Sequence, residues 1–291
     1  MSSFVIKIIA IITMLCDHSG DAILGRFSFL NIIGRIAFPL FCFQLVVGYK
    51  HTKDVKKYIF RLFIFGIISQ IPFSLFTYCY IGRFDLLNVF FTLAIGLLAV
   101  YILDTLPKKY KILAIVLDVI LMILAEFAQT DYGWFGVCLI LCIYLFYNDK
   151  KSEPNRDASP NAVTYFNNNI LFFIMFFALC LIKYSSNFGM TYTSIVIAQI
   201  LGTFFPVIFM LLYNGKKGPS LKYSFYIFYP AHLLILTIIH YLIWFSSNVD
   251  GPFWKFYLLS RNIFTSLGIF KKVRCYLKIF RKSASFIKNS Y

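Results

Sequence analysis

Charged residues are scarce in this chain, and acidic ones are the scarcest. Only 14% of the 291 residues are charged, and 12 Asp and Glu stand against 28 Lys and Arg, which gives a net charge of +16. With 60% hydrophobic residues, the composition excludes a soluble domain with a single core. The basic residues lie in short segments between apolar runs and in the tail, so the positive charge indicates membrane orientation and not binding to nucleic acid.

Several catalytic and metal-binding motifs are also missing. The sequence has no glycine-rich phosphate loop, no G-x-S-x-G turn and no H-E-x-x-H helix. Its seven cysteines are scattered, and although Cys138 and Cys142 are one helical turn apart, no second pair or histidine completes a metal signature. We therefore expect no bound metal, and we expect any phosphate group to be held by lysine and arginine.

What the sequence has in abundance is apolar runs of membrane-spanning length. A helix needs about 20 apolar residues to cross the hydrocarbon core. The runs cover residues 4–24, 30–48, 56–77, 86–103, 111–128, 132–147, 169–184, 193–213 and 223–246. They predict an all-α, polytopic helical membrane protein with about nine to ten transmembrane helices.

The segments between the runs predict the orientation. If the spans are counted correctly, three basic loops and one long hydrophilic linker fall on the same side: 49–57, 107–111, 214–222 and 148–169. The positive-inside rule makes this side cytoplasmic, so the N-terminus is cytoplasmic and the protein is a multi-pass protein of the inner or plasma cell membrane. No Lys or Arg lies in the first six residues and no small-residue cleavage site follows the first run, which we interpret as a retained span.

The C-terminal part departs from this pattern. We expect residues 1–246 to form the transmembrane domain and residues 247–291 to form a basic, aromatic tail. After Asp250 there are nine basic residues and no acidic ones, on what nine spans would make the outer side. The rule therefore favours a tenth crossing or a re-entrant segment, with a helix lying on the membrane surface as the alternative.

Ionisable residues inside the first run point to a site. Lys7 and His18 are eleven residues apart, so they share one helix face and lie about 16 Å apart along the axis. Asp17 adjoins His18, and Asp21 follows one turn later. Such residues are costly in hydrocarbon unless they are paired or face a cavity. The stripe predicts a membrane-embedded site for a long anionic ligand with a reactive end.

His18 is the best candidate for a catalytic base, because imidazole changes protonation most easily near neutral pH. Asp21, three residues later, is a better placed partner than the adjacent Asp17. The alternative is that these residues only mark the outer interface, where water solvates them. Arg35, in the second run, either contacts an anionic ligand or developing oxyanion or pairs with Asp17 or Asp21.

Other polar residues in or near the runs are weaker candidates. Arg61 and Lys57 lie near the cytoplasmic end of the third run and could bind phosphate, although Arg61 could equally extend to the interface. Three residues are either substrate contacts or structural groups that hold helices together: Gln70, Asn88 and His232.

Four segments resemble, in order, the TraX family of integral membrane proteins, which is named for N-terminal acetylation of the conjugative pilin. They are IKIIAIITMLCDHSGDAIL, NIIGRIAFPLFCFQLVVGYKHTKDVKKYIFRLFIFGIISQIPF, LNVFFTLAIGLLA and KYSFYIFYPAHLLIL, and the match runs from about Ile6 to His240. The family is similar to a larger superfamily of transmembrane acyltransferases. There, a basic residue precedes the catalytic histidine by ten intervening residues; here Lys7 takes that position, where arginine is more usual, and His18 takes the histidine's.

The resemblance implies acetyl transfer from cytoplasmic acetyl-CoA to an acceptor amine or hydroxyl at or beyond the membrane. The acceptor stays open among a pilin N-terminus, a surface glycan and a small molecule. His18 would act as the base or carry the acetyl group transiently. The rival hypothesis is a proton-coupled secondary transporter or flippase, because intramembrane Asp, His, Lys and Arg also form proton relays.

Overall fold

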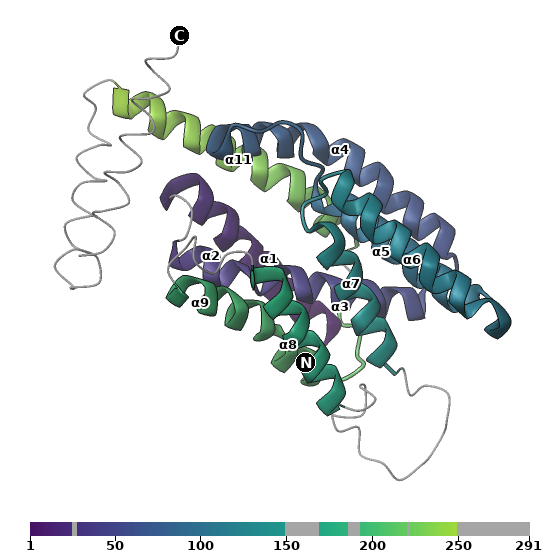
Figure 1. The fold of residues 1–291 in the computed structure, drawn as a ribbon. Helices are drawn as coiled ribbons and strands as arrows, with labels where there is room; N and C mark the ends of the chain where they lie inside the picture. Colours follow the sequence, from purple (N-terminus) through teal and green to yellow (C-terminus); the bar gives the residue numbers. More distant parts are fainter. Residues whose placement is uncertain (25–27, 149–168, 186–192, 220–221, 249–291) are drawn as a thin grey trace. The chain divides into compact units, whose positions relative to one another are not determined.

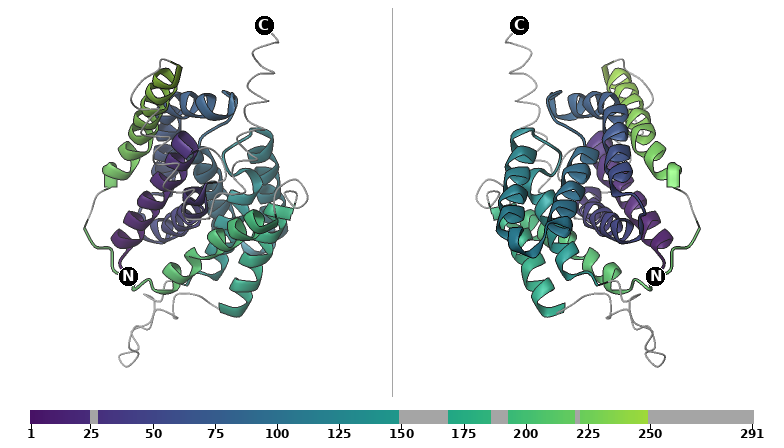
Figure 2. Two further views of the ribbon diagram at one scale, coloured as in Figure 1. Left: turned by 90° about the vertical axis from the view of Figure 1, so that its left-hand side faces the viewer. Right: turned by 90° about the vertical axis from the view of Figure 1, so that its right-hand side faces the viewer.

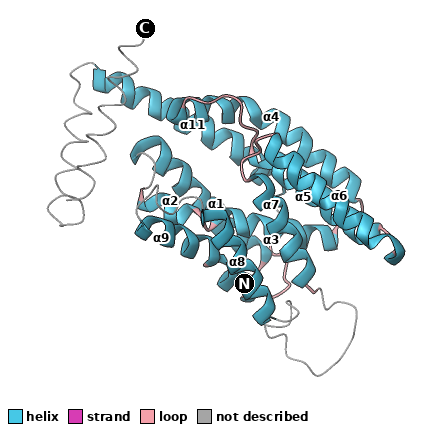
Figure 3. Cartoon of the chain, in the orientation of Figure 1, coloured by secondary structure: helices cyan, strands magenta, loops and turns pink. Residues whose placement is uncertain are grey.

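The computed structural model describes residues 1–24, 28–148, 169–185, 193–219 and 222–248, and in these residues it is helical, without a β-strand (Figures 1 and 3). Residues 1–238 form one compact unit and residues 239–291 a second one, of which only the last part of α11 is described. The helices are α1 (Ser3–Ser19), α2 (Phe29–Gly34), α3 (Ala37–His51), α4 (Val55–Ile81), α5 (Val89–Thr105), α6 (Lys111–Phe127), α7 (Gly133–Phe146), α8 (Asn169–Ser185), α9 (Thr193–Phe204), α10 (Pro206–Leu211) and α11 (Lys222–Asn248).

Each apolar run of the sequence is mostly helical, which confirms the predicted all-α membrane fold. In the described residues, however, only four helical stretches are long and apolar enough to cross a membrane: Ser3–Leu24, Phe29–His51, Val55–Ile81 and Ser224–Ile243. Other apolar helices are shorter, such as Val89–Thr105. A helix of 17 residues rises about 26 Å, less than the hydrocarbon thickness of about 30 Å. The number of full-length spans is therefore lower than the nine to ten predicted, and the tail beyond Asn248 lies outside the described residues.

The second span is broken between α2 and α3, at Arg35 and Ile36. Pro39 explains the position of the break, because a proline four residues later has no N–H for the carbonyl of residue 35 and its ring clashes with that carbonyl. Gly34, just before the break, brings α2 against α1: a Cβ at Gly34 would lie 2.3 Å from the Cβ of Asp17. The break therefore places Arg35 at a helix end beside α1.

The middle helices pack against one another and leave apolar surface outside. α5 contacts α4, α6 and α7, and α8 lies against α9 (Figure 2). The outer face of α6 carries large exposed side chains, with Ile112 80% and Phe127 87% exposed. A contiguous apolar face of this kind is typical of contact with lipid and would be a liability in water.

The loops predicted on one side of the membrane do come together where they are described. The backbone N–H of Ser3 donates to the carbonyl of Lys216 over 2.8 Å, which joins the N-terminus to the loop after α10. The Tyr49 hydroxyl, near the end of α3, donates to Asp104 Oδ2 near the end of α5 over 2.7 Å. These contacts agree with the expected alternation of the spans, whereas most of the linker at 148–169 lies outside the described residues.

Candidate functional site

A cavity of about 430 Å³ lies within the first compact unit, and both ends of the predicted stripe are in its wall. Lys7 lines one end and His18 the other, together with side chains from α3, α4, α5 and α11. Both belong to α1, about 16 Å apart along its axis. The prediction that one helix face carries an elongated site is therefore matched by a cavity along that face.

The Lys7 end of the cavity is basic and aromatic. Arg61 and Lys217 line it beside Lys7, and no carboxylate within the described ranges forms an ion pair with any of these three cations. The Arg61 Nε donates to the Tyr226 hydroxyl over 3.2 Å, and the guanidinium carbon lies 4.9 Å from the ring centroid of Tyr58. Cations held in this way, without a counter-ion, suit an anionic ligand.

Lys57 does not belong to this group. It is exposed, it is not among the described residues that line the cavity, and its Nζ lies 3.2 Å from Asp54 Oδ2. Asp54 caps the N-terminus of α4 and accepts a hydrogen bond from the backbone N–H of Lys57 over 3.0 Å. That backbone bond, with the Lys57 ammonium, holds the pKa of Asp54 below its usual range. The pair stabilises the helix start, so the predicted cofactor contact of Lys57 gains no support.

At the opposite end, the partner of His18 is a histidine and not the expected carboxylate. His18 Nδ1 lies 2.7 Å from His232 Nε2, and His232 Nδ1 lies 2.8 Å from the carbonyl oxygen of Phe228. The His18 ring also contacts Phe76, with 5.3 Å between ring centroids. His232 is buried and is not one of the described residues lining the cavity, so the predicted substrate contact of His232 gains no support.

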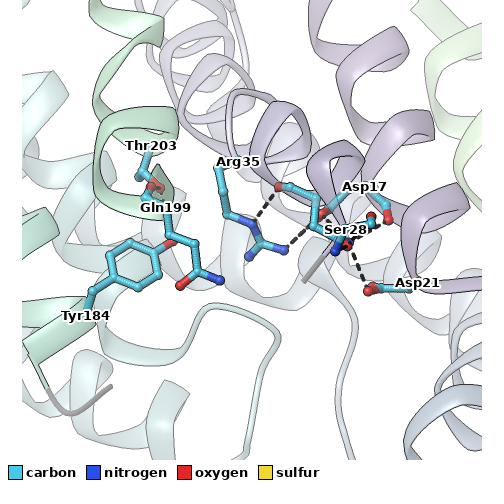
Figure 4. Close-up of polar contacts among 8 residues, drawn as sticks. Asp17, Asp21, Ser28, Arg35, Tyr184, Gln199 and Thr203 are labelled. Atoms are coloured by element: carbon cyan, nitrogen blue, oxygen red, sulfur yellow. Dashed lines mark hydrogen bonds and ion pairs between the residues drawn. The ribbon is translucent and has the colours of Figure 1, made fainter. Parts of the chain in front are cut away.

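Asp17 of α1 and Asp21, in the helical turn Gly20–Leu24 that follows α1, are held by Asn31 and Arg35 of the second span instead (Figure 4). The Arg35 Nη2 lies 2.9 Å from Asp17 Oδ1 and 3.2 Å from Asp17 Oδ2. The Asn31 side-chain amide donates to Asp17 Oδ1 over 3.2 Å and to Asp21 Oδ1 over 2.9 Å. Figure 4 shows the Arg35 side chain between this cluster and Gln199 of α9.

Of the two interpretations of Arg35, the ion pair with Asp17 is the one that the structure contains. Arg35 is not among the described residues that line the cavity, whereas Asp17 is. The expected contact between Arg35 and a developing oxyanion gains no support. The expected pairing of His18 with Asp17 or Asp21 is replaced by the His232 contact, because α2 binds both carboxylates.

Asp131, which the sequence analysis did not single out, also lines the cavity. It lies in the turn before α7, where its backbone N–H donates to the carbonyl of Leu87 over 2.8 Å. Burial raises the pKa of its carboxyl to about 6, although Arg35 opposes this shift. The next residue, Tyr132, stacks on Phe38 with 3.5 Å between ring centroids. The only feature of the sequence that could have pointed to Asp131 is that it is a carboxylate in a short turn between two apolar runs.

Gln70 and Asn88 hold helices together. The Asn88 amide donates to Gln70 Oε1 over 2.9 Å and to the carbonyl of Gly66 over 2.7 Å. The Gln70 amide donates to the carbonyl of Leu86 over 2.7 Å. These bonds tie α4 to the start of α5, and neither side chain is among the described residues of the cavity wall. The alternative of a helix-packing role accounts for both.

Two buried polar groups in the cavity wall have no hydrogen-bond partner in the part of the chain that the structure describes. They are the Gln44 side-chain nitrogen and the Tyr229 hydroxyl. A buried polar group without a partner costs free energy, so a bound ligand that accepts a hydrogen bond would relieve this cost. Among the described residues, no group of three His, Cys, Asp or Glu is placed to hold a metal ion.

Comparison with known proteins identifies the family. The family described as TraX protein matches residues 2–240. The "Probable fimbrial assembly protein FimC, serogroup H1" of Dichelobacter nodosus is 31% identical over 255 residues, which cover 81% of this chain and 94% of that protein. The "Uncharacterized protein RP591" of Rickettsia prowazekii (strain Madrid E) is 26% identical over 147 residues, 50% of this chain and 56% of that protein. No solved structure matches significantly. From the family match over most of its length, we conclude that this chain belongs to the TraX family.

Proposed function

We propose that the protein is an integral membrane acetyltransferase that transfers the acetyl group of acetyl-CoA to an acceptor at or beyond the membrane. The observation that supports this best is the cavity, which connects cations that form no ion pair with a described residue at one end with the imidazole of His18 at the other. A donor with a phosphate-bearing head and a long arm ending in a thioester has the matching distribution of charge and reactivity.

The donor's phosphates would bind at Lys7, Arg61 and Lys217. Basic groups bind phosphate through charge-assisted hydrogen bonds, and these three have no carboxylate competing for them among the described residues. The arm would then extend along α1 towards His18. By the positive-inside rule, the basic end would face the cytoplasm, where the donor is available.

At the other end, His18 Nε2 would act as the general base. It would remove a proton from the acceptor as the acceptor atom attacks the thioester carbonyl carbon. The new bond to carbon forms and the carbon–sulfur bond breaks, and the imidazolium then returns its proton to the thiolate of CoA. Atoms and charge balance without a metal or a redox partner.

For the acceptor, the cavity favours an amine. Asp131 faces the cavity as a carboxylate with no ion pair to another described residue, and an amine acceptor arrives as a cationic ammonium that such a group attracts. The ammonium would first release one proton to water, and the neutral amine would then attack the thioester while His18 takes the second proton. The relative from Dichelobacter nodosus is named a probable fimbrial assembly protein. Both points support an amine of a surface-fibre subunit over a surface glycan hydroxyl or a small molecule.

The test uses the full chain in lipid nanodiscs with acetyl-CoA labelled in the acetyl group. With an amine peptide as acceptor, we expect release of the CoA thiol and labelled peptide, and we expect neither with His18→Ala. Proteoliposomes made from the same protein address the rival transporter. Flux that depends on a proton gradient, with no thiol release under any condition, would replace the acetyltransferase proposal by that function. Mass spectrometry of envelope material from wild-type and deletion cells would identify the acceptor.

A further inference from the structure

Two imidazoles from opposite ends of the first unit form a relay beside the cavity. His18 belongs to α1 and His232 to α11, and the sequence separates them by 214 residues. The chain of contacts runs from His18 Nδ1 to His232 Nε2 over 2.7 Å, and from His232 Nδ1 to the carbonyl of Phe228 over 2.8 Å. Only His18 of this pair lines the cavity.

The relay determines which nitrogens carry protons. A carbonyl oxygen can only accept a hydrogen bond, so His232 Nδ1 carries a proton and donates it to Phe228. In neutral His232, Nε2 is then an acceptor, and His18 Nδ1 must be the donor. The remaining nitrogen, His18 Nε2, is left with a free lone pair. In the part of the chain that the structure describes, no carboxylate contacts either ring that would favour a charged imidazole.

The ring geometry agrees with this hydrogen bond. The centroids of the two imidazoles are 5.0 Å apart and their planes differ by 15°. Rings stacked face to face at van der Waals distance could not bring two nitrogens within 2.7 Å of each other. The rings must therefore lie nearly in one plane, edge to edge, where a ring N–H points at the other ring's lone pair. One face of the His232 ring is stacked with Phe228, with 4.8 Å between centroids.

We propose that His232 is a positioning residue that holds His18 in the tautomer with its proton on Nδ1, so that Nε2 is always the base. The catalytic consequence rests on the proposed acetyl transfer, but the tautomer itself does not. Phe228 sets the proton on His232, His232 sets the proton on His18, and the cavity receives a single defined lone pair. A base in the wrong tautomer cannot take the acceptor's proton.

Spectroscopy tests the tautomer without any reaction. The chain contains four histidines, so a His51→Gln and His240→Gln background leaves only the two of interest. With ¹⁵N-labelled histidine in nanodiscs, solid-state NMR should show a protonated Nδ1 and an unprotonated Nε2 for both rings. After His232→Leu, His18 should populate both tautomers. A wild-type His18 with its proton on Nε2, or one unaffected by His232→Leu, would overturn the proposal.

Kinetics of the otherwise unmodified chain give the second readout. His232→Leu should lower kcat by about 10²-fold or more while the Kd for acetyl-CoA stays unchanged, because His18 is no longer held in the tautomer and orientation that make Nε2 the base, whereas the donor site is intact. His232→Gln, whose side-chain oxygen can accept the same hydrogen bond, should recover a large part of the rate. Equal rates for the Leu and Gln variants, both far below wild type, would overturn the positioning role. If the NMR result holds but no variant or wild type releases CoA thiol, the acetyltransferase proposal fails and the tautomer assignment stands.

Discussion

The two ends of the cavity use ionisable residues in opposite ways. At one end Lys7, Arg61 and Lys217 form no ion pair with a described carboxylate, and aromatic rings lie against the first two. At the other end two pairs are formed, Asp17 with Arg35 over 2.9 Å and His18 with His232 over 2.7 Å, whereas Asp131 of the cavity wall has no ion pair with another described residue.

Under the proposed function, this difference separates the end of the cavity that binds the donor from the end where the acetyl group is transferred. A cation without a counter-ion can still gain interaction free energy when it binds an anionic ligand. A network of paired groups instead holds each group in one orientation. The basic end should therefore determine donor affinity, and the His18 end should determine rate and stability.

The largest expected effect is on the rate. His18→Ala should lower turnover by about 10⁴-fold, because it removes the general base, while acetyl-CoA binding stays close to wild type. Thiol release measures turnover, and equilibrium binding of labelled donor measures affinity. His51→Ala is the matched control, since His51 lines the basic end. A histidine lost there should leave the rate at saturating donor unchanged. Near wild-type turnover in His18→Ala would remove this residue from catalysis.

The next effect is on stability. Arg35→Gln should lower the free energy of unfolding by about 3 kcal/mol, because it leaves the carboxylate of Asp17 largely buried without its partner. Asp17→Asn should be similarly costly, and the double variant should lose less than the sum. Denaturant unfolding in detergent gives the three values. If the losses of the two single variants add up to that of the double variant, the 2.9 Å contact between Arg35 and Asp17 contributes no interaction energy to stability.

A smaller effect is expected on donor affinity. Lys7→Ala should weaken acetyl-CoA binding about tenfold, the equivalent of one charge-assisted hydrogen bond, and Lys7→Arg should retain most of it. A short acetyl thioester without the nucleotide should react equally poorly with wild type and Lys7→Ala. Lys57→Ala is the control, because Lys57 is exposed and lies outside the described cavity wall. If Lys7→Ala slows the short thioester as strongly as acetyl-CoA, then Lys7 does not bind the phosphates.

The smallest effect concerns Asp131 and depends on pH. Burial raises the pKa of its carboxyl to about 6, above the range of an unfolded chain. Between about pH 4 and that value, folded protein keeps a proton that unfolded protein releases, so this group lowers stability as pH rises. Asp131→Asn should therefore be more stable than wild type above pH 6, by about 1 kcal/mol given that the residue is only half-buried, with no difference near pH 4. If the stability difference between Asp131→Asn and wild type is the same near pH 4 and above pH 6, the raised pKa of Asp131 is contradicted.

Much of the local structure could be predicted from the sequence. The apolar runs coincide with helices because about twenty apolar residues stabilise a helix in lipid whatever packs beside them. Lys7 and His18 face the same cavity because a spacing of eleven residues places them on one side of a helix. Arg35 beside Asp17 was one of two interpretations, since a buried arginine requires an anion and the nearest ones lie in the preceding span.

Other features depended on contacts that no local pattern encodes. Gln70 and Asn88 were predicted either to contact a substrate or to hold helices together, and their carbonyl partners were decided by how α4 and α5 pack. The partner of His18 was expected among its neighbours in α1, yet Asn31 and Arg35 of the second span take both carboxylates.

The sequence by itself determined an all-α membrane protein whose first helix carries a cation and an imidazole on one face, because helical periodicity and hydropathy act over a few turns. Only the tertiary structure decided that His232 lies 2.7 Å from His18, that Asp131 faces the same cavity, and that Lys57 does not. These relations join residues far apart in the chain, and they follow from which helices become neighbours. A pattern repeated every 3.6 residues contains no information about that choice.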